Sequence, residues 1–151
     1  MTTVYDVPHD LLVEAVASDL RKTEQAQPPP WASFVKTGVH REKSPSERDW
    51  WHTRLAAVLR KVYIRGPVGT ERLAGEFGGA RDAGSSPYHP RKGSRSVIRT
   101  CLTQLEGLGY VRKGDKGGRS ITPKGQSYLD GKARQIMTRM AKKRPELAKY
   151  L

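Results

Sequence analysis

Long cationic side chains recur in four parts of the chain and are the residues best suited to chemistry with a ligand. Arginine and lysine bind phosphate oxygens where nearby carboxylates do not neutralise them. Residues 81–119 hold nine basic side chains against three acidic ones. For any single arginine, solvation or pairing with a nearby carboxylate is as good an explanation as contact with a phosphate. The prediction therefore depends on the clustering of the cations. We predict a phosphate-binding surface from these candidates: Lys36 and Arg41; Arg54, Lys61 and Arg65; Arg81, Arg91, Lys92, Arg95 and Arg99; and Arg112, Lys113, Lys116 and Arg119.

The overall charge of the chain favours the same chemistry. The 151 residues include 28 Lys and Arg against 15 Asp and Glu, a formal net charge of +13. Residues 1–30 carry a net charge of −3, so residues 31–151 carry +16. A positive field of this size attracts phosphate backbones and makes copies of the chain repel one another. We therefore expect a nucleic acid as the partner and a monomer before that partner is bound.

Catalysis, metal binding and membrane insertion are poorly supported by the residues. The four histidines are scattered without metal-ligand spacing, and no glycine-rich phosphate loop is present. The single cysteine, Cys101, cannot form an internal disulfide and fits a buried position. No apolar run spans a bilayer, and Asp6 and Asp10 interrupt any signal-like start. We expect no enzyme activity, no cofactor, no metal and no membrane partner, in a soluble intracellular protein.

One long amphipathic helix positions several of the candidate cations. Leu55, Val58, Leu59 and Val62 follow the spacing of a core-facing helix, with Trp51 one turn earlier. Ser46 is a suitable cap at its start, and Gly66-Pro67 ends it. We predict that the cationic stripe of Arg54, Lys61 and Arg65 lies on a face not needed for packing. Trp51 and Trp31 are expected in the core; Trp50 and Tyr88 are the better candidates for exposure.

The remaining elements follow from capping, periodicity and glycine or proline breaks. Asp6-Val7-Pro8 resembles a helix start, and the apolar spacing that follows predicts a helix of roughly 15 residues. Ser94 and Thr122 are further caps. The elements predicted after the long helix are a short helix at 70–77, a long surface loop at 80–93, a helix at 94–108, a β-hairpin of strands 110–113 and 119–122, and a last helix from Thr122 to a charged tail that frays after Pro145.

This order of elements is typical of a winged helix-turn-helix. The fold class predicted is therefore mainly α, with a helical domain, a small antiparallel β-hairpin wing and an extra N-terminal helix. We expect one domain over residues 1–151: an N-terminal helix and linker at 1–46, a winged-helix core at about 47–140, and a tail at about 141–151. A DNA-binding transcription regulator is one function such a fold serves. A protein–protein adaptor that docks through its acidic N-terminal helix is another.

Several strings resemble the small-subunit ribosomal protein nineteen family of archaea and eukaryotes, in the right order over roughly residues 2–135. They are Pro29 to His40, Asp49-Trp50-Trp51, Arg54 to Tyr63, Gly66 to Gly69, Tyr88 to Ser94, Ile98 to Leu108, and Thr122 to Gly125.

This resemblance implies a cytoplasmic protein of the small-subunit head, bound to ribosomal RNA beside other ribosomal proteins, with a part in late subunit maturation. Two departures are a less basic stretch at 81–86 and a basic extension past about residue 135. Carried over by position, the resemblance assigns RNA contacts to Arg54, Arg60, Lys61, Arg91, Lys92, Arg95 and Arg99.

Overall fold

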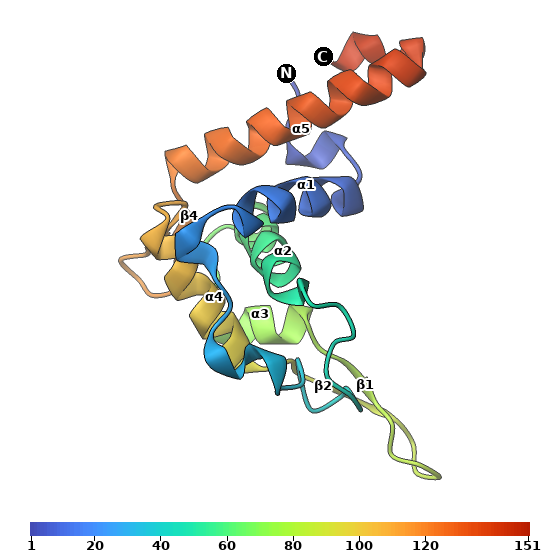
Figure 1. Cartoon of the computed structure of the whole chain (residues 1–151), viewed down its shortest axis with the longest axis vertical. Coiled ribbons are helices and arrows are strands. Elements are labelled where there is room, and N and C mark those ends of the chain that lie inside the picture. Colours follow the sequence, from blue (N-terminus) through green and yellow to red (C-terminus); the bar gives the residue numbers. More distant parts are fainter.

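Five α-helices and two small antiparallel hairpins make up the chain in a computed structural model that describes all 151 residues (Figure 1). The prediction of a mainly helical, winged-helix fold is confirmed. Short 3-10 helices join or flank these elements. The bounds are η1 Val4–Asp6, α1 His9–Arg21, η2 Glu24–Ala26, η3 Pro30–Ser33, α2 Trp50–Arg65, α3 Thr70–Glu76, β1 Gly79–Arg81, β2 His89–Arg91, α4 Arg95–Gly107, β3 Val111–Lys113, β4 Arg119–Ile121, α5 Pro123–Lys143 and η4 Pro145–Tyr150.

Helix α2 is the centre of the core, as its apolar stripe predicts. Leu55, Val58, Leu59 and Val62 are fully buried against α1, α4 and β4. The helix ends at Gly66, whose φ of 67° is strained for any residue with a side chain. It begins at Trp50, four residues later than the predicted cap. The first helical hydrogen bond runs from the amide of Thr53 to the carbonyl of Asp49, so Ser46 caps nothing.

Three tryptophans pack together at the start of α2. Trp51 is buried, and its indole N–H donates to Oε1 of Gln104 on α4 at 2.8 Å. Trp31 and Trp50 meet it edge to face, with ring centroids 5.6 Å and 5.5 Å away. The predicted burial of Trp51 is confirmed. The expectation of an exposed Trp50 is wrong, because its ring is half-buried against Trp51.

The winged-helix order is α2, α3, α4 and then the wing, β3 and β4. Val68, between α2 and α3, forms an isolated β-bridge to the wing that the sequence did not predict. It exchanges two backbone hydrogen bonds with Arg119 of β4, at 2.8 Å and 2.9 Å. The predicted caps at Ser94 and Thr122 are confirmed, because Ser94 accepts from the amide of Val97 and Thr122 from that of Gly125.

The N-terminal helix begins later than predicted. Asp6 lies in η1, where its carboxylate accepts a 2.7 Å hydrogen bond from the amide of Thr3. Val7 is extended, so α1 starts only at His9, after Pro8. Asp19, near the other end of α1, accepts from the hydroxyl of Tyr128 at 2.8 Å and pairs with Lys132 at 2.5 Å. These contacts fasten α1 to α5.

The two ends of the described chain lie side by side (Figure 1). The hydroxyl of Thr2 donates to the carbonyl oxygen of Tyr150 at 2.9 Å. Where the sequence predicted a frayed end after Pro145, the structure forms η4, which folds back on α5. Leu147 of η4 packs against the hydrophobic core. The charged composition of the tail gave no sign of this contact.

His52 of α2 should make the fold sensitive to acid. It is 6% exposed, neither ring nitrogen has a hydrogen-bond partner, and burial lowers its pKa below the ordinary 6.5. Nearby Asp49 opposes this shift and Arg21 adds to it. Between the two pKa values the unfolded chain binds more protons than the folded one, so stability falls as the pH drops through 6.5.

We expect urea unfolding to show this loss of stability between about pH 7.5 and pH 5. The His52→Leu variant should lose less over the same range, because it has no proton to take up there. Comparing slopes with pH separates this effect from any change in basal stability. An equal slope in both proteins would assign the sensitivity to other groups, such as His40, whose pKa burial also lowers.

Candidate nucleic-acid interface

Strands β1 and β2 form an arm, residues 79–91, that projects from the helical body (Figure 1). The prediction of an irregular loop at 80–93 is therefore wrong in part, because these strands pair antiparallel from Gly79 with Arg91 to Arg81 with His89. The arm is exposed along nearly all its length, so its short strands lack the apolar alternation that predicts a hairpin. Tyr88 is 56% exposed on it, as expected.

Glycines allow three segments to meet closely at the base of the arm. The amide of Gly93 donates to the carbonyl of Ala74 in α3, and Gly38 bridges to Gly93 across the first loop. A Cβ atom on Gly78 would lie 2.2 Å from the carbonyl oxygen of Arg91. Only glycine permits this approach, and it brings residues 36–43, the end of α3 and the start of α4 to one place.

Five of the predicted site residues gather there from separate parts of the sequence, and we call them the arm-base cluster. A cavity of about 810 Å³ is lined by Arg41 and Arg54, together with the aromatic rings of Trp50 and Phe77. A second cavity of about 530 Å³ lies along the start of α4, and Val39 of the first loop borders it. The members of the arm-base cluster are Arg41, Arg54, Arg91, Lys92 and Arg95. Lys36 is exposed in the first loop beside Thr37 and lines neither cavity.

Arg54 is the most unusual member of the cluster. Its guanidinium carbon lies 4.5 Å from the centroid of the Phe77 ring, and the residue takes part in none of the seven ion pairs. Burial lowers the pKa of Arg54 below its usual value. The prediction that this stripe of α2 is free of packing is wrong here, because Phe77 covers one side. The charge is held in place by an aromatic ring and left without an acidic partner.

Lys92 and Arg95 are held by one carboxylate, that of Glu71 on α3. Arg95 Nη2 donates to Glu71 Oε1 at 2.9 Å, and both cations form ion pairs with that side chain. Hydrogen bonds from Arg95 and Lys92 lower the pKa of Glu71 to about 2. All three side chains are about half exposed, so an incoming phosphate can take the place of Glu71.

We expect the Glu71→Gln variant to bind single-stranded RNA of mixed sequence about two to five times more tightly than the parent protein. The substitution frees Lys92 and Arg95 from a charged competitor and keeps the side-chain shape. Fluorescence anisotropy at moderate salt measures the change. Glu146→Gln, which makes the same charge change on η4 far from the cluster, is the control. An equal gain in RNA affinity in this control would mean that net charge alone causes the effect.

Three other candidates on α2 and the wing are committed to internal pairs. Lys61 and Arg65 both contact Glu76 of α3, at 2.8 Å and 2.7 Å. Glu76 therefore offsets part of both charges, although the Arg65 side chain remains 55% exposed. Arg119 Nε pairs with Glu106 of α4 at 2.8 Å and fastens the wing to that helix.

The structure leaves the remaining candidates outside the cluster. Arg60 is half-buried on α2, and its Nε is buried without a hydrogen-bond partner. The others are exposed, lie in no ion pair and belong to three different parts of the fold: Arg81 in the arm, Arg99 on α4, and Arg112, Lys113 and Lys116 in the wing.

Two residues of the site escaped the sequence analysis. Phe77 supports Arg54, although 23 positions separate them in the sequence. Only the packing of α3 against the rest of the fold brings them together, so no local pattern could reveal it. Lys43 also lines the larger cavity, together with two carboxylates, Glu42 and Glu47. A polar loop of mixed charge carried no signal that distinguished Lys43.

The side of α4 that faces the N-terminal linker is covered. Gln104 accepts from Trp51 and donates to the backbone carbonyl of Gln27 at 2.7 Å. Helix η2 packs against the same side of α4. The two cations of this helix, Arg95 and Arg99, are exposed.

Neither a metal centre nor a membrane-spanning element emerges from the geometry. The structure brings together no group of three or more His, Cys, Asp or Glu side chains suited to a metal ion. No helix combines the length and the apolar character needed to cross a bilayer. Cys101 is buried, as predicted, and burial raises the pKa of its thiol to about 12.

Fold and charge together define a basic winged-helix protein whose cations are spread over several elements. The sequence model of the family Ribosomal protein S19e matches residues 3–139, and the chain belongs to that family. It is 45% identical over 151 residues to the small ribosomal subunit protein eS19 of Thermoplasma acidophilum, with both chains covered completely. The eS19 protein of Aeropyrum pernix is 47% identical over 153 residues, again with full coverage. The eS19B protein of Schizosaccharomyces pombe is 40% identical over 128 residues, 85% of this chain and 90% of that protein.

Proposed function

We propose that the protein is a structural component of the small ribosomal subunit that binds ribosomal RNA through the arm-base cluster. Family membership and the names of the relatives support the assignment to the small ribosomal subunit. Seven of the 28 lysines and arginines lie in ion pairs, so most of the positive charge is available to phosphates. The proposed interface recognises the shape and the backbone charge of the RNA, and it needs no catalytic group.

The observation that carries the RNA contact is the state of Arg54. A half-buried guanidinium without an acidic partner has lost part of its hydration and has gained no protein acceptor in exchange. It lies in a cavity that Arg41 and Lys43 also line, where a phosphate oxygen would supply the missing acceptor. Phe77 holds the planar group in position before the RNA arrives, which lowers the entropy lost on binding.

The remaining exposed cations extend this contact over several elements. Arg81 in the arm, Arg99 on α4 and the wing residues Lys113 and Lys116 face solvent without acidic partners. A curved, irregular RNA surface meets such scattered charges more readily than straight duplex DNA does. The linker that covers one side of α4 also argues against a helix that enters the major groove, so the transcription-regulator alternative is not favoured.

Sedimentation of a tagged copy in native cell lysate tests the proposal. We expect the protein to travel with small-subunit RNA through the gradient at both moderate and high salt, because an assembled component resists salt that dissociates loose electrostatic binding. A protein that remains at the top of the gradient, or follows DNA, would overturn the proposal and support the regulator.

We propose a cytoplasmic site of action, on the ribosome, for a protein that is monomeric before assembly. Its net charge of +13 opposes self-association. We also propose that it assists late maturation of the small subunit, for which family membership is the only support. Depletion of the protein should then cause precursor small-subunit RNA to accumulate, and unchanged RNA processing would contradict this part of the proposal.

A further inference from the structure

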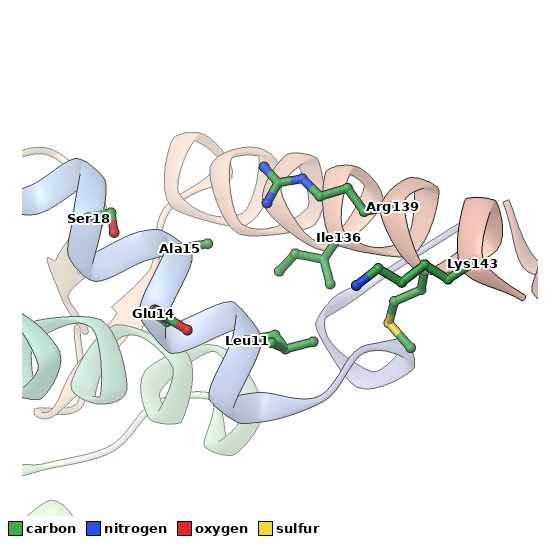
Figure 2. A pocket seen from close by; sticks show the side chains of 8 residues that line it. Leu11, Glu14, Ala15, Ser18, Ile136, Arg139 and Lys143 are labelled. Atoms are coloured by element: carbon green, nitrogen blue, oxygen red, sulfur yellow. The ribbon is translucent and has the colours of Figure 1, made fainter.

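Helices α1 and α5 are fastened together at one end and enclose an open groove at the other. Lys132 and Tyr128 of α5 hold Asp19 of α1 at the closed end. A cavity of about 380 Å³ lies between the helices and runs from Ser18, next to Asp19, back to Leu11 near the start of α1 (Figure 2). We call it the α1–α5 groove. It lies on different elements from those that form the arm-base cluster.

The floor of the α1–α5 groove is apolar. Leu11 and Ala15 of α1 face Ile136 and Met140 of α5 across it. Figure 2 shows Ile136 extending from α5 toward the side of the groove that Leu11 and Ala15 form. Leu11 is 41% exposed although it lies on a helix whose other apolar positions are buried or half-buried. Apolar side chains left at the mouth of a groove favour an apolar ligand group there.

The two rims of the groove carry opposite charges. Glu14 stands on the α1 rim, with Asp10 exposed one turn earlier, and Arg139 and Lys143 stand on the α5 rim. None of these four residues takes part in an ion pair. The same two helices form an ion pair at their closed end, between Lys132 and Asp19. A ligand that lies in the groove can meet both rims at once.

We propose that this groove binds an amphipathic segment of a neighbouring protein in the small subunit. The segment would place an apolar side chain on the floor and a carboxylate against Arg139 and Lys143. This inference rests on the proposed function, because the neighbouring protein belongs to the same small ribosomal subunit. Its ligand class is new: an acidic and apolar protein segment, bound on a surface separate from the RNA contacts.

Two other occupants fit the groove less well. RNA would have to place phosphates near Glu14 and Asp10, within residues 1–30, whose net charge is −3. A second copy of this chain could match the opposite rims, but two chains of +13 repel one another over their whole surfaces. A protein segment can place its carboxylate against the α5 rim alone, away from Glu14, whereas RNA carries a phosphate at every nucleotide.

Site-specific photo-crosslinking in assembled particles tests the proposal. A full-length tagged chain carries a photo-reactive amino acid at position 11, and small subunits purified through the tag are irradiated. We expect one ribosomal protein to be crosslinked, at a segment that mass spectrometry shows to hold an apolar residue beside Asp or Glu. A crosslink to RNA, to a second copy of the chain, or to nothing in intact subunits would overturn the proposal.

Charge reversal on the α5 rim supplies the second arm of the test. The Arg139→Glu and Lys143→Glu double variant should reduce the crosslink yield about tenfold while the protein still sediments with the small subunit. The matched control reverses Arg134 and Lys142 to Glu, two exposed cations of α5 outside the groove, and should leave the yield unchanged. Equal loss in both variants would reject the groove as the docking site. Loss of the parent protein from the subunit would instead reject the proposed function, and the gradient shows this before irradiation.

Discussion

The Arg54→Met variant is expected to bind single-stranded RNA about 10 to 100 times more weakly than the parent protein, because it loses a charged hydrogen bond to phosphate worth about 1.5–3 kcal/mol. Methionine keeps an apolar stem to pack on Phe77, so the fold should be retained. Fluorescence anisotropy at several salt concentrations measures the affinity, and a thermal melt confirms folding. The logarithmic salt dependence should also become shallower, because one phosphate contact is lost.

Arg112→Met is the matched control for Arg54. Arg112 is an exposed wing residue with no ion pair, so its replacement removes the same charge from a different place. We expect a loss of no more than about threefold there, as for a rim charge. If both variants weaken binding equally, net charge alone governs the affinity and Arg54 has no special place.

Trp51→Ala is expected to cost about 3–5 kcal/mol of stability, the largest loss at any single position discussed. The substitution empties a site between α2 and α4, removes the edge-to-face contacts with Trp31 and Trp50, and leaves Gln104 without its indole donor. A loss of this size is a large part of the total stability of a domain. Urea denaturation followed by circular dichroism measures it.

The neighbouring tryptophan is the control for this prediction. Trp50 is half-buried and donates no side-chain hydrogen bond to the protein, so Trp50→Ala should cost clearly less. RNA binding by Trp51→Ala should fall only in proportion to the unfolded fraction. If the folded fraction of that variant also binds RNA weakly, Trp51 has a role in binding beyond stability.

Local rules were sufficient for most of the fold. Leu55 and Val62 lie on one helical stripe, and the caps at Ser94 and Thr122 each depend on residues three positions away. Such signals operate within one or two turns of chain, so the sequence displays them directly. Helix ends were predicted less accurately: Asp6 and Ser46 are suitable caps by type, but Asp6 ends the 3-10 helix η1 and Ser46 lies in a loop, and α1 and α2 begin only at His9 and Trp50.

The interface was predictable in composition and unpredictable in arrangement. The sequence shows that Lys61, Arg65 and Arg95 are cationic, but their pairing with Glu76 and Glu71 depends on how α3 packs. The arm and the β-bridge at Val68 likewise depend on distant backbone partners. Charge clustering therefore identified the correct kind of surface, and tertiary contacts decide which of its members are available.

The contact between the first and last elements gives the molecule an order of assembly during synthesis. Val4 in η1 is fully buried, and η1 packs against α5, which follows more than a hundred residues later. A nascent chain on a translating ribosome therefore holds its first apolar residues uncovered until residues 123–150 have left the exit tunnel. Chains that stop early keep this surface open to chaperones and proteases. Because α5 covers the buried side of η1, only a chain translated as far as α5 and η4 reaches the folded state that can join a particle.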